Sequence, residues 1–207
     1  IQAQILELLK KHFLLLSCGL MAIPILHAQS GNRPNIIYIM CDDLGYSDIG
    51  CYGQEYIRTP HLDRMAREGM RFTQAYAGSP VSAPSRASFM TGQHTGHTVI
   101  RGNKEIPVEG QHPLPSDTYT IFKMLKANGY KTSVFGKWGL GAPGTEGAPE
   151  NQNIDEFFGY NCQRIAHNYY PYHLWHNDKK IMLDGNKDKN EDDLANSVRR
   201  PKFTFRS

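Results

Sequence analysis

Residues 118–136, TYTIFKMLKANGYKTSVFG, join a helix pattern directly to a strand pattern. Apolar side chains at helical spacing predict a helix over residues 118–128. Gly129 is a typical helix stop, because glycine readily adopts the left-handed conformation that ends many helices. The run that follows predicts a strand over residues 131–136. A helix that leads into a strand is the repeating unit of an α/β sheet.

The same alternation extends toward the N-terminus. The isoleucine-rich run NIIYIMC at residues 35–41 predicts a buried strand. A helix is predicted over residues 59–69, a second strand over residues 70–75, and a short helix over residues 84–92. We therefore expect an α/β fold with a mostly parallel sheet flanked by helices, whose functional loops gather at the carboxyl ends of strands. The Gly- and Pro-rich tract 139–153 predicts a surface loop.

Composition excludes several classes of protein. The chain has 207 residues, of which 40% are hydrophobic and 21% charged, as in ordinary globular domains. Its formal net charge is +3, and its Lys and Arg residues are scattered along the sequence. Because no basic stripe is present, we expect no nucleic-acid partner.

The N-terminal segment has the layout of a secretory signal peptide. Lys10 and Lys11 precede an apolar run over residues 13–26. This run is too short to span a bilayer, which takes about 20 apolar residues, so no permanent membrane span is expected. We predict that residues 1–28 are removed on export to the periplasm or the extracellular space. Lipoprotein anchoring at Cys18 is the alternative.

The cysteine pattern predicts no disulfide framework. Cys18, Cys41, Cys51 and Cys162 are the four cysteines, and removal of the signal peptide would leave three. Their spacing does not match a zinc site. Free thiols, with at most one bridge, are expected.

Asp42 and Asp43 follow the predicted strand at residues 35–41. Adjacent carboxylates repel one another, and a hard cation such as Ca²⁺ or Mg²⁺ would relieve that repulsion by binding their oxygens. A solvated turn is the other interpretation of an isolated Asp-Asp pair. The rest of the sequence has to decide between them.

The segment at residues 82–92, SAPSRASFMTG, resembles the signature of the type I sulfatases. That signature has Cys or Ser, then any residue, Pro, a variable residue and Arg, and it closes with Thr-Gly. Three further segments resemble sulfatases in the family's order, at residues 33–53, 59–77 and 129–141. The resemblance covers residues 33–184. It implies an alkaline phosphatase-like fold and hydrolysis of sulfate esters, on a sulfated glycan or an aryl sulfate.

In such a protein a maturation enzyme oxidises the residue at the position of Ser82 to formylglycine. The aldehyde hydrate carries two hydroxyls, one to attack sulfur and one to expel sulfate. Taken alone, Ser82 would be interpreted as a helix-capping serine. The resemblance also implies that Ser82, once modified, joins Asp42 and Asp43 as a ligand of Ca²⁺, with Mg²⁺ as the other candidate.

Three further positions are assigned by the resemblance. Arg86 lies one helical turn beyond Ser82 and can stabilise anionic oxygens. Lys137 matches the lysine that contacts the nucleophile and the sulfate oxygens. His167 is a candidate substrate contact, although a surface or packing role is the simpler interpretation. The family commonly has His two positions after the lysine, where this chain has Gly139.

The expected domain organisation is a signal peptide at residues 1–28, the N-terminal part of a sulfatase catalytic domain at residues 29–190, and a divergent polar tail at residues 191–207. The second pair of metal ligands and a further substrate-binding lysine have no counterpart in the sequence. We therefore expect a truncated site. Two other functions compete with a sulfatase: a phosphoesterase of the same superfamily, and an inactive secreted fragment or binding protein.

Overall fold

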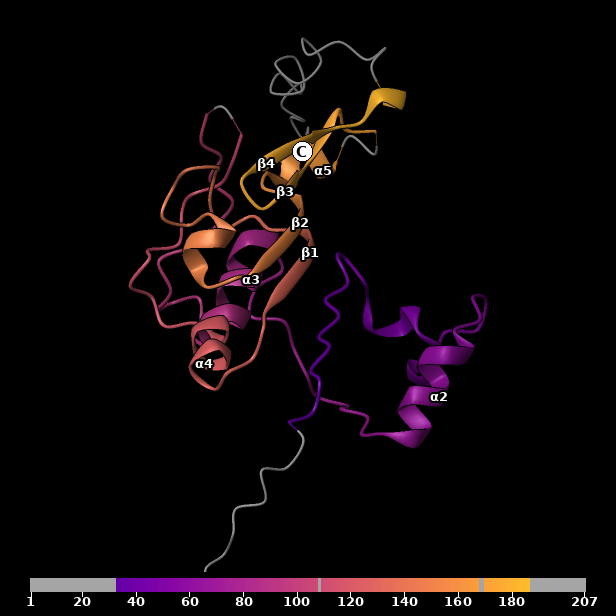
Figure 1. Ribbon diagram of the computed structural model, residues 1–207. Helices are drawn as coiled ribbons and strands as arrows, with labels where there is room; N and C mark the ends of the chain where they lie inside the picture. The colour runs from indigo at the N-terminus through magenta and orange to yellow at the C-terminus, as the bar shows by residue number, and fades with distance from the viewer. Residues whose placement is uncertain (1–32, 108, 168–169, 187–207) are drawn as a thin grey trace, which may run out of the picture. The chain divides into compact units, whose positions relative to one another are not determined.

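The computed structural model describes residues 33–107, 109–167 and 170–186 of this chain (Figure 1). The predicted signal peptide, Cys18 and the predicted polar tail lie outside these residues and stay predictions. Every helix in the described part is too short or too polar to cross a membrane. The chain divides into two units, Ile1–Asp43 and Leu44–Ser207, which are described separately below.

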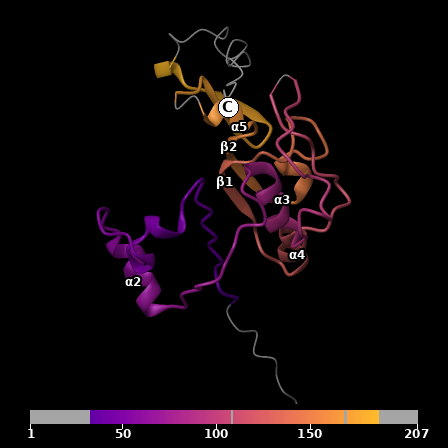
Figure 2. The same ribbon diagram turned by 180° about the vertical axis from the view of Figure 1, so that it is seen from behind.

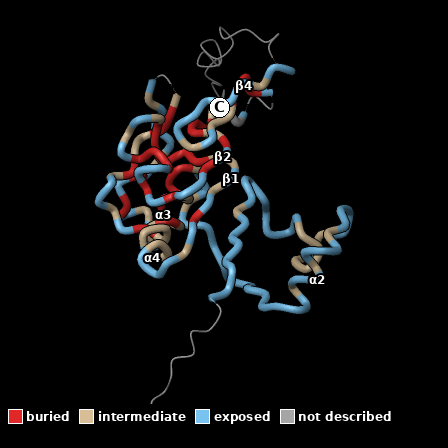
Figure 3. Tube along the Cα trace, in the orientation of Figure 1, coloured by how far each residue is buried: buried red, intermediate tan, exposed pale blue. Residues whose placement is uncertain are grey.

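In the first unit, the strand predicted over residues 35–41 does not form. The segment is irregular and almost entirely exposed, with Ile37 at 85% exposure, and most of it is pale blue in Figure 3. A strand is defined by hydrogen bonds to a neighbouring strand, and the described part of this unit contains no other strand to supply them. The strand predicted from this apolar run was therefore wrong.

The second unit begins with short helical turns and one longer helix. The 3-10 turns η1 (Tyr46–Asp48) and η2 (Gly50–Tyr52) precede α2 (Pro60–Glu68), which confirms the helix predicted there. Asp63 ties these elements together, because its Oδ1 accepts from the Cys51 N–H at 2.7 Å. Residues 70–75 form no strand, so that prediction was wrong. Among the described residues, no neighbouring segment pairs with them.

The next two helices were predicted from sequence. They are α3 (Ser82–Thr91) and α4 (Ile121–Ala127), and each differs from its prediction by a few residues at the ends. Thr120 caps α4 by accepting a hydrogen bond from the Lys123 N–H at 3.3 Å. Both helices lie beside the first two strands of the sheet in front and rear views (Figures 1 and 2).

The sheet has four strands in the order β1-β2-β3-β4. Their bounds are Ser133–Lys137, Glu156–Tyr160, His173–His176 and Lys179–Met182. β1 and β2 are parallel, whereas the pairs β2–β3 and β3–β4 are antiparallel. The short elements η3 (Pro149–Gln152), α5 (Gln163–Ala166) and η4 (Asp184–Asn186) complete the described chain. The predicted α/β class is confirmed, with one parallel pair in the described sheet.

The core lies between α3 and the β1–β2 region, where the buried segments are red in Figure 3. It is built from apolar side chains that share almost complete burial: Ala83, Ala87, Met90, Ile100, Leu114, Trp138, Leu140, Ile154 and Phe157. Burying such side chains contributes about 1.5–3 kcal/mol for each large one. This packing places α3 against the ends of the first two strands.

The prediction of a surface loop at residues 139–153 was also wrong, because much of this tract is buried. Leu140 and Ala148 have no exposed surface, and neither does Gln152. The amide of Gln152 donates to the carbonyl oxygens of Leu114 at 3.1 Å and Glu146 at 3.0 Å. A buried loop needs partners for its backbone polar groups, and Gln152 provides one for Glu146 of this loop while also binding the preceding segment at Leu114. The Gly and Pro content did not reveal this.

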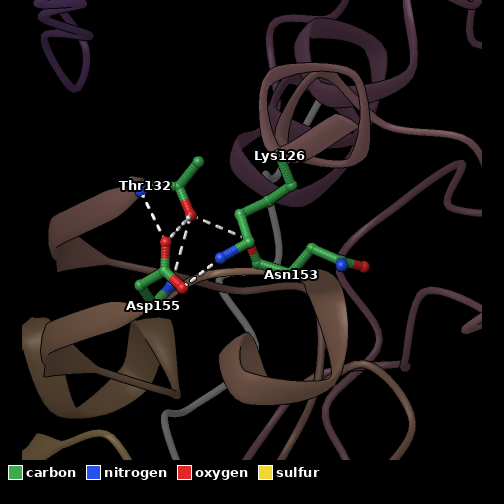
Figure 4. Close-up of polar contacts among 4 residues, drawn as sticks. All are labelled: Lys126, Thr132, Asn153 and Asp155. Carbon is green, nitrogen blue, oxygen red and sulfur yellow. Dashed lines mark hydrogen bonds and ion pairs between the residues drawn. The ribbon is translucent and has the colours of Figure 1, made fainter. Parts of the chain in front are cut away.

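A polar cluster fixes the register of the parallel pair (Figure 4). Thr132 and Asp155 immediately precede β1 and β2, and Asp155 Oδ2 accepts from the Thr132 N–H at 2.8 Å. Thr132 Oγ1 donates to the carbonyl oxygen of Asn153 at 2.7 Å, and Lys126 at the end of α4 forms an ion pair with Asp155. Ser133 is thereby paired with Glu156, and four residues later Lys137 is paired with Tyr160. The cluster therefore fixes the position of Lys137 along the strand relative to its partner Tyr160 on β2.

This cluster predicts a specific acid sensitivity. The hydrogen bond from Lys126, followed by that from the Thr132 backbone, holds the pKa of Asp155 below its ordinary value. A lowered folded-state pKa stabilises the fold above the unfolded pKa of about 3.9, and this stabilisation is lost as pH falls through the folded value. We expect Asp155→Asn to lower the Tm at neutral pH and to flatten its fall between about pH 4 and pH 2.

Thermal scans across this pH range test the prediction. Glu150→Gln, which changes an exposed carboxylate in η3, is the matched control and should keep the wild-type profile. Parallel acid profiles for wild type and Asp155→Asn would contradict the assignment.

Candidate active site

Helix α3 carries Ser82 in its first turn. Val81 occupies the N-cap position in an extended conformation, so Ser82 is the first helical residue rather than the cap. Ala83 and Pro84 are buried, whereas Ser82 is half-buried. Gly92 ends the helix in the left-handed conformation, with φ 66°. The signature therefore folds as one helix whose buried face anchors it and whose first residue reaches the surface.

Arg86 connects this helix to the sheet. It lies four residues after Ser82, which places both on one side of α3. Its Nη1 donates to the carbonyl oxygen of Lys137 at 2.6 Å, across 51 residues of sequence. Charged donors make hydrogen bonds roughly twice as strong as neutral ones. The contact brings the predicted residues Arg86 and Lys137 together.

Lys137 is the last residue of β1, one residue beyond the strand predicted over residues 131–136, and is half-buried. The Trp138 N–H continues the parallel pairing by donating to the Tyr160 carbonyl oxygen at 2.9 Å. The indole of Trp138 donates to the Gly147 carbonyl oxygen at 2.8 Å and is buried. Lys137 thus lies between a fixed strand and a fixed aromatic side chain, which limits its backbone freedom.

Asn103 was not singled out from the sequence. Its Oδ1 accepts a hydrogen bond from the Ala83 N–H at 3.0 Å. The bond joins a loop residue to the first turn of α3, 20 residues away in sequence. No spacing rule predicts such a contact, because the residue that caps a helix normally lies next to it in sequence.

Gly139 departs from the family pattern, and the structure gives a steric reason. Its φ of +78° lies in the left-handed region. A Cβ at this position would lie 2.5 Å from Oε1 of Gln163, a side chain that is 3% exposed. That oxygen has no hydrogen-bond partner among the described residues. A side chain at position 139 would therefore have to displace the buried end of the Gln163 side chain.

Asp42 and Asp43 lie in an exposed bend at the end of the first unit, not at the end of a strand. Asp43 has φ 57°, an uncommon value for a residue other than glycine. Carboxylate oxygens suit Ca²⁺ or Mg²⁺, and two aspartates could provide only part of the six or more oxygens that such a cation takes. Within the described residues, no group of three or more His, Cys, Asp or Glu could hold a metal ion. The ligand assignment stays a prediction.

His167 and the cysteines complete the list of predicted positions. His167 is exposed at the C-terminal end of α5, and its role as a substrate contact stays a prediction. Cys41, Cys51 and Cys162 are free thiols, as expected.

The family model named Sulfatase matches residues 34–205. The chain belongs to the sulfatase family. The matched range includes the signature at residues 82–92 and the other three segments that resemble sulfatases, apart from Arg33. The family model and the resemblance of the single segments therefore agree.

Curated relatives include sulfatases of different kinds. The chain is 44% identical over 112 residues to a steryl-sulfatase of Mus musculus, covering 52% of this chain and 18% of that protein. It is 40% identical over 149 residues to an N-acetylgalactosamine-6-O-sulfatase of Bacteroides thetaiotaomicron, covering 69% and 27%. Human arylsulfatase A is 41% identical over 128 residues, covering 61% and 25%. The chain thus spans about a quarter or less of these relatives.

Solved structures share the fold. One is a Bacteroides thetaiotaomicron structure described as part of the metabolism of multiple glycosaminoglycans. It is 34% identical with a TM-score of 0.62, and the match covers 74% of this chain and 33% of that chain. Ps i-CgsB in complex with k-i-k-neocarrahexaose is 31% identical, with a TM-score of 0.57, over 69% and 36%. The α/β fold of the described chain is therefore that of part of a sulfatase.

The contact between Gly139 and Gln163 generates a stability prediction. Gly139→Ala should destabilise the fold by about 2–4 kcal/mol, because it adds a steric contact to an unfavourable φ. Gly144→Ala is the matched control, since Gly144 has φ +76° but nothing within 4 Å of its Cβ position. It should cost about 1 kcal/mol, the backbone part alone. Urea unfolding measures both values.

The double variant Gly139→Ala with Gln163→Ala isolates the contact. It should be less destabilised than the sum of the single changes, with a coupling of about 1 kcal/mol or more. Strict additivity, or equal losses for Gly139→Ala and Gly144→Ala, would show that Gln163 does not restrict position 139.

Proposed function

We propose that this chain carries the nucleophile and two cationic groups of a sulfuric ester hydrolase, with Ser82 acting after its conversion to formylglycine. The observation that carries the proposal is the contact between Arg86 and Lys137. This hydrogen bond holds α3, whose first residue is Ser82, close to the end of β1, where Lys137 lies. An oxygen nucleophile can attack the sulfur of a sulfate ester, and positive groups beside it can stabilise the negative charge that develops on the transferred group.

The proposed chemistry needs two hydroxyls on one carbon. A separate maturation enzyme removes two electrons and two protons from the Ser82 side chain, and water adds to the aldehyde. One hydroxyl oxygen then bonds to sulfur while the sulfur–ester oxygen bond breaks and the alcohol leaves with a proton. The second hydroxyl loses its proton, the carbon–oxygen bond to the sulfate group breaks, and the aldehyde is restored. Unmodified serine has no second hydroxyl for this last step.

Arg86 and Lys137 have distinct tasks in this mechanism. The Arg86 guanidinium has five N–H donors, and its bond to the Lys137 carbonyl oxygen uses one of them. Its positive charge can stabilise anionic oxygens on the modified residue 82. Lys137 is a compact charge that can bind a sulfate oxygen. Both charges oppose the negative charge that develops on the transferred group.

A divalent cation would complete the site. The resemblance of the sequence to sulfatases implies Asp42, Asp43 and the modified Ser82 as its ligands, and carboxylate oxygens suit a hard cation such as Ca²⁺ or Mg²⁺. When bound, such a cation acts as a Lewis acid toward a sulfate or nucleophile oxygen.

The relatives support two substrate classes. An N-acetylgalactosamine-6-O-sulfatase and a structure in complex with k-i-k-neocarrahexaose are among the similar proteins, which favours a sulfated sugar. Arylsulfatase A supports an aryl sulfate as a second substrate. Export through residues 1–28 would place the protein with extracellular glycans, in the periplasm or outside the cell.

Conversion of Ser82 is the first test. Co-expression with a serine-type maturation enzyme should produce a loss of two hydrogens in the peptide that contains Ser82, detected by mass spectrometry. Ser82→Ala should lack this change. In a version that spans the whole length of its sulfatase relatives, Ser82→Ala should also lower sulfate release from 4-nitrophenyl sulfate by about 10³-fold or more, because the nucleophile is gone, whereas the 207-residue chain alone should release sulfate negligibly.

Ser88→Ala is the control, since Ser88 lies on the buried face of the same helix and should still permit conversion of Ser82. An active protein with unmodified serine would reject the formylglycine mechanism. Faster release of phosphate than of sulfate from the matched 4-nitrophenyl esters would instead favour the phosphoesterase alternative.

The cation assignment makes a separate prediction. Asp43→Asn should weaken Ca²⁺ binding by about tenfold or more, because an anionic oxygen is replaced by a neutral amide. Isothermal calorimetry measures the affinity. Asp178→Asn, at an exposed position after β3, is the control and should bind as the wild type does. Equal affinities for all three proteins would remove Asp43 from the ligand set.

A further inference from the structure

Asn103 holds the peptide group that joins Ser82 to Ala83. Its Oδ1 accepts from the Ala83 N–H at 3.0 Å. The N-cap residue Val81 has no side-chain oxygen and makes no side-chain cap hydrogen bond. Ala83 has no exposed surface, so water is a poor replacement for Asn103. The loop residue therefore caps α3 from outside the helix.

The same bond fixes the orientation of the carboxamide. An N–H donor requires an acceptor, so the end of Asn103 that faces Ala83 is its oxygen. The other end is then an NH₂ group with two donor hydrogens. Asn103 is an exposed residue, in contrast to the fully buried Ala83. Its side chain thus combines an anchored acceptor with an accessible donor beside the peptide that follows residue 82.

This arrangement points to a role beyond capping. The proposed site already has two cationic groups, Arg86 and Lys137, and neither supplies a neutral, fixed donor. We propose that Asn103 is a further substrate-binding residue, whose Nδ2 donates a hydrogen bond to an oxygen of the sulfate group held at residue 82. A donor that is fixed before the substrate arrives needs little reorganisation. The inference rests on the proposed function.

One substitution separates the two roles of Asn103. Asn103→Asp keeps an oxygen that can accept from the Ala83 N–H, and Asp caps helices as well as Asn. It replaces the donor by an anionic oxygen, which repels sulfate. A purely structural cap predicts normal sulfate binding in this variant, whereas a substrate contact predicts stable protein with impaired binding.

The experiment measures Tm together with the affinities for inorganic sulfate and 4-nitrophenyl sulfate by calorimetry. Asn103→Asp should keep the Tm within about 2 °C of wild type and weaken both affinities by at least about tenfold. The loss should persist near 1 M salt, where screening acts over about 3 Å, because a direct contact is poorly screened. Asn103→Ala should lower both the Tm and the affinities.

Gln93→Glu is the matched control, because it makes the same change from amide to carboxylate at an exposed position just after α3. It should bind both probes as the wild type does. Unchanged affinities in Asn103→Asp would overturn the inference, and so would a loss that disappears at high salt.

Lys137→Met distinguishes failure of the inference from failure of the proposed function. If Lys137→Met abolishes binding and Asn103→Asp does not, the sulfate site stands and Asn103 is a cap alone. If the wild type binds neither probe, or Lys137→Met binds as the wild type does, the proposed sulfate site is itself wrong. The inference about Asn103 then falls with it.

Discussion

The hydrogen bond from Arg86 to the carbonyl oxygen of Lys137 is the contact on which the proposed site depends. Residues 51 positions apart could not share a substrate unless α3 were held against the end of β1. The buried face of α3, with Ala83 and Ala87 at 0% exposure, supplies the close packing that allows the approach. The charged bond then selects one position of the helix along the strand, because apolar packing alone is not directional.

The position of Lys137 depends in turn on a polar cluster at the other end of the strand. The bond between Thr132 and Asp155 sets the pairing of β1 with β2, and the backbone then carries that register to Lys137 and Tyr160. A shift by one residue would turn each side chain to the opposite face of the sheet. Specific polar contacts therefore fix the geometry of the site, while the core supplies most of the favourable free energy.

Elements whose structure depends on local patterns could be predicted from the sequence. The helix at residues 118–128 and the strand after it were predicted from periodicity and from Gly129, and both form. The strands expected at residues 35–41 and 70–75 do not form, because a strand also needs a partner that local sequence does not specify. The tract 139–153 was expected at the surface from its Gly and Pro content, yet much of it is buried, and the Gln152 side chain binds the carbonyl oxygens of Glu146 in the tract and Leu114 outside it.

The sequence by itself determined the family, the candidate nucleophile Ser82 and the spacing of Arg86 one turn away, because a helical signature encodes these relations locally. Tertiary structure decided which residues distant in sequence lie next to the signature helix and the end of β1. The contact of Arg86 with Lys137, the cap that Asn103 places on Ala83, and the exclusion of a side chain at Gly139 by Gln163 all join residues at least 20 positions apart. Contacts of this kind arise from packing and backbone hydrogen bonding in three dimensions, and no periodicity in the chain records them.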